Sequence, residues 1–234
     1  MRAKPKRTLG MQVAAWIETF CVHGPGDILG QPVELTQDEK RLLAWAYELD
    51  DAGRRIVRRS LVGLPKGSRK TEFAAWVALA ETAGPVRFGS WDEKGNPIGQ
   101  RQHDPLVIVA ASTYEQADLL FGAARAVVTE GPLSEFFEAF DRELLLKGET
   151  GKLVRVPAVS GANDGARPTF VALDETHEWT GSKQRVALVL ENGLSKRADA
   201  WSLSITTAGN PKVESVALQQ YEYGRKVDSG EVED

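Results

Sequence analysis

The chain is poor in the residues that form disulfides and metal clusters. Its 234 residues include a single cysteine, Cys21, and three histidines that are spread along the sequence without forming a group. One cysteine cannot make an internal disulfide, and it cannot supply a cysteine-based metal cluster. The fold must therefore rest on an apolar core, for which the 42% hydrophobic residues and the chain length are sufficient.

Long apolar runs and an excess of positive charge are also lacking. No apolar stretch approaches the roughly 18 residues that cross a bilayer, and the basic N-terminus lacks a signal-peptide core and cleavage site. The net charge of −4 argues against a protein that coats nucleic acid by overall positive charge. Basic residues do gather at 2–7 and 54–60, where a local DNA contact and a plain solvated surface both remain open. We expect a cytosolic protein with no membrane partner.

What the sequence does contain is an alternation of short strands and helices. The segments 106–111 and 170–173 are short and fully apolar, as in strands buried inside a parallel sheet. Further strands are expected at 55–62, 153–156 and 202–206. Helices are expected at 36–51, 70–83, 114–129, 185–194 and over the last 20 or so residues. This order predicts a three-layer α/β fold with a mostly parallel central sheet.

Residues 1–33 are expected to form a helical lead-in, with a helix over 11–21. Thr36 then has the character of an N-cap residue, and Glu39 stands three positions later, as in a capping box. The polar segment 89–104 is expected to be a surface hairpin or insertion, whereas the apolar segment 136–140 is ambiguous.

The loop at 64–71 reads Leu-Pro-Lys-Gly-Ser-Arg-Lys-Thr, between an expected strand and an expected helix. It partly matches the phosphate-loop pattern G-x-x-x-x-G-K-[ST], with Lys70 and Thr71 at its end. Backbone N–H groups at a helix start bind phosphate oxygens. Lys70 would then reach the β and γ phosphates, and the Thr71 hydroxyl would bind Mg²⁺. The nucleotide-binding residues expected here are Pro65, Lys66, Gly67, Ser68, Arg69, Lys70 and Thr71.

Both glycine positions of that pattern are occupied by other residues, Leu64 and Arg69. The departure at Arg69 is the more serious, because glycine's free φ is lost where the backbone must approach phosphate closely. Two interpretations follow from the sequence. Either the Arg69 guanidinium also faces phosphate, or nucleotide binding is impaired.

Two acids follow the apolar strand at 170–173. Asp174 and Glu175 would be delivered to the carboxyl edge of a parallel sheet, where such sheets bind ligands. Asp174 would hold Mg²⁺, and Glu175 would polarise the attacking water as general base. The alternative is that two acids simply end a strand. His177 follows closely, and a switch or packing role near the γ-phosphate is expected for it.

Three segments, in this order, resemble the ATPase domain of the large terminases of tailed bacteriophages. The first is 65–71, similar to the family's deviant Walker A loop with a basic residue, here Lys66, early in the loop. The second is 173–179, similar to the Walker B segment with its trailing histidine and tryptophan. The third is 205–210, similar to the coupling motif, in which Thr207 would sense the γ-phosphate or its water. Gln37 is placed like the glutamine that meets adenine.

The resemblance implies a RecA-like (ASCE) P-loop fold over 34–234, with ATP and Mg²⁺ as cofactors. It also implies a homo-oligomeric ring on a portal protein, double-stranded DNA as the translocated substrate, a small terminase subunit as partner, and a monomer in isolation. The site of action would be the cytoplasm of the infected bacterium, outside the mature virion. Catalytic residues would be Glu175, Lys70 and Lys66, with an arginine finger offered to the neighbouring subunit. Arg125 is the first candidate for that finger, and Arg142 and Arg197 are its rivals.

A full terminase also carries a C-terminal nuclease domain, which this chain is expected to lack, so no nuclease activity is expected. The chain would then be an excised ATPase domain or a naturally shortened gene product. Two other functions remain open. A helicase-like DNA-dependent ATPase would share these motifs, but such enzymes need two RecA lobes and 234 residues hold one. A degenerate nucleotide-binding module that only binds a partner is favoured by Arg69.

Overall fold

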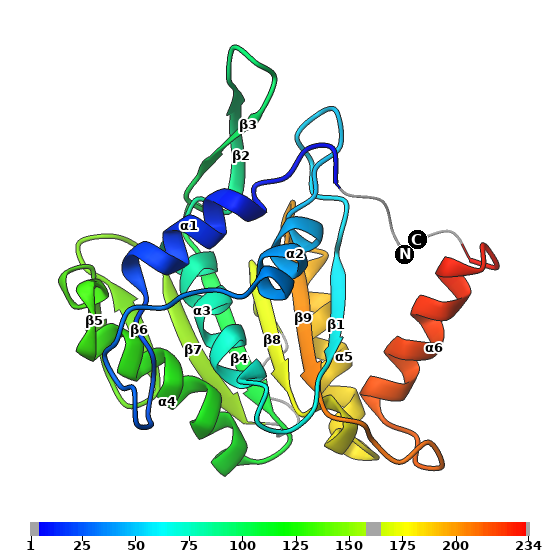
Figure 1. Cartoon of the computed structure of the whole chain (residues 1–234). Coiled ribbons are helices and arrows are strands. Elements are labelled where there is room, and N and C mark those ends of the chain that lie inside the picture. The colour runs from blue at the N-terminus through cyan, green and yellow to red at the C-terminus, as the bar shows by residue number, and fades with distance from the viewer. Residues whose placement is uncertain (1–4, 158–164, 233–234) are drawn as a thin grey trace.

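A computed structural model describes residues 5–157 and 165–232 and contains a mostly parallel sheet of seven strands (Figure 1). The strand order is β1-β9-β8-β4-β7-β6-β5. Five strands run parallel: β1 (Arg59–Gly63), β9 (Trp201–Thr206), β8 (Phe170–Asp174), β4 (Leu106–Ala111) and β7 (Lys152–Pro157). Two antiparallel strands, β6 (Glu143–Leu146) and β5 (Phe137–Ala139), extend the far edge. The mixed α/β class and the mostly parallel sheet are confirmed.

Helices cover both faces of this sheet, which gives the three expected layers (Figure 1). On one face, α3 (Lys70–Ala83) and α4 (Tyr114–Glu130) pack against the central strands, and on the other face α5 (Ser182–Leu194) packs on β8 and β9. Alternate residues of one strand enter different cores: Val107 joins the α3 side, whereas Ile108 joins the α5 side. Strands buried on both faces need apolar side chains throughout, which explains the unbroken apolar runs in the sequence.

The P-loop helix α3 is a core helix, because most of its residues are buried. Two N-terminal helices, α1 (Gly10–Phe20) and α2 (Gln37–Ala46), lie over it. A Cβ added at Gly10 would come within 2.4 Å of the Leu43 carbonyl oxygen, so glycine is what allows α1 and α2 to approach this closely. The capping box of Thr36 and Glu39 at the start of α2 is present as expected.

Several boundaries differ from those expected. Helix α2 ends at Ala46 instead of near residue 51, because the chain there turns into short bridges, Thr8 with Glu48 and Leu49 with Arg55. Strand β1 begins at Arg59 instead of residue 55. The ambiguous segment 136–140 contains β5, and β6 was not expected.

The remaining elements lie around this frame. The polar segment forms the hairpin of β2 (Arg87–Trp91) and β3 (Pro97–Gln100), which projects from the molecule (Figure 1). A short 3-10 turn, η1 (Pro132–Glu135), precedes β5, and another, η2 (Thr176–Glu178), follows β8. The last helix is α6 (Val216–Asp228). Among the described residues, no helix combines the length and the apolar character needed to cross a membrane.

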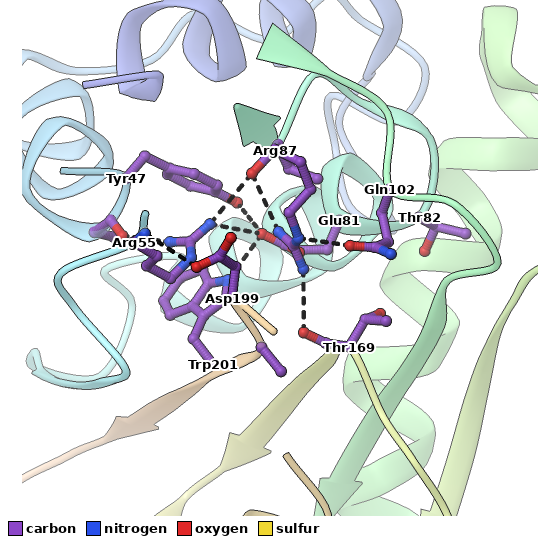
Figure 2. Close-up of polar contacts among 12 residues, drawn as sticks. Tyr47, Arg55, Glu81, Thr82, Arg87, Gln102, Thr169, Asp199 and Trp201 are labelled. Atoms are coloured by element: carbon purple, nitrogen blue, oxygen red, sulfur yellow. Dashed lines mark hydrogen bonds and ion pairs between the residues drawn. The ribbon is translucent and has the colours of Figure 1, made fainter. Parts of the chain in front are cut away.

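A buried charge cluster holds the N-terminal segment and the hairpin onto this frame (Figure 2). Its centre is Glu81, fully buried near the end of α3. The Glu81 carboxylate accepts hydrogen bonds from the Tyr47 hydroxyl (2.8 Å), the Trp201 indole N–H (2.8 Å) and Arg87 Nη1 (2.9 Å). The Arg55 guanidinium lies 3.6 Å from the same carboxylate, over the rings of Tyr47 and Trp201. Burial keeps the pKa of Arg55 below its usual range, at about 10.

Candidate functional site

The three sequence motifs meet at one edge of the sheet. Strand β1 ends at Gly63, which pairs with Thr206 at the end of β9, and the loop that follows β1 hydrogen-bonds back to Thr206 through the Leu64 N–H. Asp174 ends β8, the next strand along. Because these strands are parallel, their carboxyl ends lie side by side, and this is the edge where α/β sheets bind ligands.

The loop 64–69 is shaped to receive an anion. Lys66 and Gly67 are exposed, and Gly67 has a left-handed φ of 80°. Helix α3 begins directly after the loop at Lys70, so the unpaired N–H groups of its first turn lie beside it. The Ser68 hydroxyl is buried and has no hydrogen-bond partner in the described part of the chain. An orphaned buried donor at this point fits a phosphate oxygen.

The lysine expected to reach phosphate is paired with the glutamate expected to act as base. Lys70 Nζ lies 3.2 Å from Glu175 Oε1, and both side chains are largely buried. The other carboxylate oxygen, Oε2, accepts hydrogen bonds from the Thr207 N–H (3.2 Å) and the Thr207 hydroxyl (3.4 Å). Glu175 has a left-handed φ of 47°, which is uncommon for a residue with a side chain. These contacts bring all three motifs together around one carboxylate.

The pair expected to hold Mg²⁺ is also assembled. The Thr71 hydroxyl donates to Asp174 Oδ2 at 3.1 Å, and Asp174 is 3% exposed. Burial, followed by the negative charge of Glu175, raises the pKa of Asp174 to about 6, against the lowering effect of the hydrogen bond from Thr71. A hydroxyl and a carboxylate are oxygen ligands of the kind that Mg²⁺ takes in nucleotide sites. The residues present therefore fit the ion.

A further polar chain leads from Glu175 to the start of α4. His177 Nδ1 lies 3.2 Å from Glu175 Oε2 and 3.1 Å from the Thr206 hydroxyl oxygen. Glu178 Oε2 accepts from Gln116 Nε2 at 2.6 Å and from the Ser112 hydroxyl at 3.1 Å. The Gln116 hydrogen bond is the main cause that lowers the pKa of Glu178.

Sequence reasoning assigned no role to this connection between η2 and α4. Ser112 directly follows β4, and Ala111 of β4 pairs with Asp174 of β8. The position of Ser112 at the end of a strand neighbouring the acidic pair was the only available signal, and it depends on strand order.

Arg69 follows neither of the two interpretations drawn from the sequence. Its backbone adopts the left-handed conformation that glycine would supply, with φ 50° and ψ 26°. Its guanidinium is paired with Glu39 of α2, with Nη2 2.8 Å from Glu39 Oε2. Gln37, expected to meet adenine, is exposed at the first position of the same helix.

The candidate arginine fingers lie apart from these residues. Arg125 is about half exposed on α4, 3.8 Å from Asp141, and Arg142 is exposed. Arg197 pairs at 3.1 Å with Asp104, which precedes β4 and so lies toward the opposite edge of the sheet. No contact found in residues 5–157 and 165–232 joins any of the three to Lys70 or Glu175. A finger that acts on a neighbouring subunit needs no such contact, so the choice among them stays a prediction.

A parallel sheet with a Lys-Thr loop after one strand and an acidic pair at the end of a near neighbour defines the P-loop NTPase class of fold. Within that class the chain belongs to the terminase large subunit family, through its ATPase domain. The family model described as "Terminase large subunit, ATPase domain" matches residues 100–226, more than half of the chain. The match includes Asp174, Glu175 and Thr207 and lies downstream of the phosphate loop.

Individual relatives extend the similarity over nearly the whole chain. The gene 13 protein of Mycobacterium phage L5 is 28% identical over 253 residues, which covers 97% of this chain and 42% of the relative. The large terminase subunit of Enterobacteria phage HK97 is 22% identical and covers 94% and 44%. The chain therefore spans less than half the length of these relatives.

Solved structures show the same fold. The crystal structure of the HK97 large terminase matches with a TM-score of 0.74 at 21% identity, covering 95% of this chain and 42% of that one. The large terminase of a thermophilic bacteriophage matches with a TM-score of 0.54 at 10% identity, covering 84% and 44%. At these identities the comparison establishes the fold and leaves the roles of single residues to the geometry of this chain.

Proposed function

We propose that this chain is the ATP-hydrolysing part of a DNA-packaging motor, which uses ATP to move double-stranded DNA into a procapsid. One observation carries the proposal: Lys70, Glu175 and Thr207, from three separate motifs, share one carboxylate at the carboxyl edge of the sheet. The neighbouring Thr71 and Asp174 complete the set of groups that phosphoryl transfer to water requires.

Each residue has a definite task in this proposal. The N–H groups from Pro65 to Thr71, apart from proline, would surround the phosphates together with the Ser68 hydroxyl, while Lys66 and Lys70 would neutralise them. Mg²⁺, held by Thr71 and Asp174, would supply charge neutralisation on the phosphate oxygens. The proposed adenine contact is Gln37. This nucleotide-binding unit is assigned to 34–234, with 1–33 as a lead-in packed on it.

Glu175 would activate the attacking water. Its Oε2 is oriented by the Thr207 N–H and hydroxyl. Its Oε1 faces Lys70 at 3.2 Å, so a move of the lysine to a phosphate oxygen would free this oxygen to accept a proton from water. Thr207 would then sense the change at Glu175 and pass it along β9.

The proposed partners are those of a packaging motor: a portal protein, a small terminase subunit and further copies of this chain in a ring. Arg125 would reach the site of a neighbouring copy. The chain would act in the cytoplasm of the infected bacterium, and it would be a monomer when isolated. We assign it no nuclease activity. No second function is proposed, because Arg69 retains the backbone conformation of the phosphate loop and so no longer favours a degenerate module.

The test is Glu175→Gln in the purified protein with Mg²⁺ and double-stranded DNA. We expect ATP to bind with nearly unchanged affinity, while DNA-stimulated hydrolysis falls by about a hundredfold or more because the base is lost. The control is Glu115→Gln, which removes an exposed carboxylate at the start of α4. Wild-type protein that neither binds nor hydrolyses ATP in any tested condition would exclude the motor function for this chain.

A further inference from the structure

The backbone at Arg69 is held in a conformation that residues with side chains rarely adopt. Its φ of 50° and ψ of 26° lie in the left-handed region, directly before the first residue of α3. A Cβ in this region meets the following carbonyl oxygen, so contacts elsewhere must stabilise the conformation. The contacts of the Arg69 side chain are therefore the place to look for its purpose.

The Arg69 guanidinium is directed away from the phosphate loop and is almost fully engaged. Its Nε donates to Glu39 Oε1 at 3.0 Å and its Nη2 to Glu39 Oε2 at 2.8 Å, a two-bond arrangement that fixes both planes. Nη2 also donates to the Glu34 carbonyl oxygen at 3.1 Å. The guanidinium carbon lies 5.4 Å from the centre of the Trp76 ring, a residue buried in α3.

Glu39 joins this pair to the first turn of α2. The same Oε2 accepts from the Thr36 N–H at 2.7 Å and from the Thr36 hydroxyl at 2.8 Å, which makes the capping box of the helix. The Glu39 side chain is only 11% exposed. The loop that starts α3 and the turn that starts α2, about thirty residues apart in sequence, are thus fixed to one another through a single carboxylate. That turn of α2 carries Gln37.

We propose that Arg69 is a positioning residue of the nucleotide site, which fixes the phosphate loop to the start of α2 so that adenine and phosphates are bound by one preorganised unit. The inference rests on the proposed ATP site. Arg69 acts through Glu39 and does not touch phosphate. Its effect therefore falls on the joint recognition of base and phosphates, and the phosphate loop alone keeps its affinity for a phosphate chain.

A double-mutant cycle with Arg69→Gly and Glu39→Gln tests this proposal in the whole chain. Glycine adopts the left-handed conformation freely, so the loop keeps its shape while the pair is lost. We expect each single variant to weaken MgATP binding by about five- to tenfold, and the double variant to bind no more weakly than the worse single one. Inorganic tripolyphosphate, titrated by calorimetry, should bind all four proteins within about twofold, and the preference for ATP over GTP should fall.

Kinetics and two further variants separate positioning from general damage. Where turnover is measured, KM should rise with kcat unchanged, because Lys70 and Glu175 are untouched. Arg69→Lys keeps the charge but cannot form both hydrogen bonds, so we expect an intermediate loss. The control is Asp38→Asn, which removes a charge from the same turn of α2 at an exposed side chain and should leave nucleotide affinity unchanged. Thermal melts verify that every variant is folded.

Three results would overturn the proposal. Weaker tripolyphosphate binding in Arg69→Gly, with Glu39→Gln unaffected, would show that the guanidinium contacts phosphate directly. Tighter nucleotide binding in Arg69→Gly would show that arginine impairs the loop. Additive losses in the cycle would show that the two side chains act independently. Wild-type protein that binds no MgATP at all would overturn the proposed function as well, whereas normal wild-type binding with an additive cycle would overturn this inference alone.

Discussion

At the scale of single residues, Asp174 shows how the site is assembled at a cost in stability. Its carboxyl is buried next to Glu175, and its pKa is raised from 3.8 to about 6. The folded protein therefore binds a proton more readily than the unfolded chain does. The stability that this proton contributes is complete below pH 3.8 and is lost as the pH rises through about 6.

This shift predicts the behaviour of Asp174→Asn. At pH 7 we expect the variant to be more stable than wild type by up to about 3 kcal/mol, since one pKa unit corresponds to about 1.4 kcal/mol. The gain should shrink toward pH 4, where the wild-type carboxyl is protonated. Urea unfolding of both proteins between pH 4 and pH 8 measures the difference. The exposed Asp38→Asn serves as control, and parallel pH profiles for wild type and Asp174→Asn would contradict the assignment.

The same pKa governs the proposed metal site in the opposite sense. A carboxylate must lose its proton to bind Mg²⁺, so the affinity for MgATP should rise as the pH increases through about 6. Titrations of Mg²⁺ into the ATP-bound protein at pH 5.5 and pH 7.5 check this expectation. Equal affinities at the two values would show that Asp174 is ionised throughout the range.

Residue chemistry was also the most predictable part of the molecule. Lys70, Thr71, Asp174 and Glu175 were identified because their chemical types and their positions after strands restrict their tasks. The environment of Arg69 could not be predicted, since its partner Glu39 lies in another element. Nothing in the local sequence tells an arginine that faces phosphate from one that faces a carboxylate.

At the scale of elements, the close packing of α1 on α2 depends on Gly10. A methyl group there would lie 2.4 Å from the Leu43 carbonyl oxygen and 2.5 Å from the Ala44 nitrogen, both backbone atoms that cannot move aside. We expect Gly10→Ala to lower the free energy of unfolding by about 1–3 kcal/mol through overpacking.

Gly122 offers the matched control for this substitution. It lies within α4, and a methyl group added there meets nothing within 4 Å. Gly122→Ala should be neutral or stabilising by up to about 1 kcal/mol, because alanine is the better helix former. Urea unfolding of the two variants decides the point. Equal effects would show that helix propensity, and not the contact with α2, dominates at Gly10.

Elements with one clear period were predicted well, and their ends less well. The strand at 106–111 was expected with its observed bounds, because it is a short apolar run flanked by polar residues. Strand β6 was missed because Glu143–Leu146 is only four residues long and carries no turn signal of its own. The early end of α2 reflects tertiary bridges that replace the helix after Ala46, which no local pattern reveals.

At the scale of the whole molecule, the Glu81 cluster joins segments that are distant in sequence. Tyr47 comes from the segment before β1, Arg87 from the hairpin, and Trp201 from the start of β9 (Figure 2). Strand order, which brings β9 next to β8 and β1, cannot be derived from the sequence alone. The cluster follows from that order, so it could not be predicted either.

Removal of the central charge should destabilise the whole fold. Glu81→Gln leaves Arg55 and Arg87 buried without their counter-charge, and breaking a buried pair costs about 3–5 kcal/mol. Glu149→Gln, which breaks the exposed pair of Arg101 and Glu149, should cost at most about 1 kcal/mol. Calorimetric melts of both variants test the contrast. A Glu81→Gln protein as stable as wild type would show that the arginines find other partners or water.

The left-handed turn at Arg69 has a consequence for how such chains can evolve. Where glycine occupies this position, the residue at 39 is free to vary, because the backbone needs no outside support. Where arginine occupies it, an acid at 39 becomes necessary, and the two positions are expected to change together among descendants. The order of change matters as well. Loss of Glu39 before Arg69 returns to glycine would pass through an unsupported loop, so the path back to the glycine pattern runs through position 69 first.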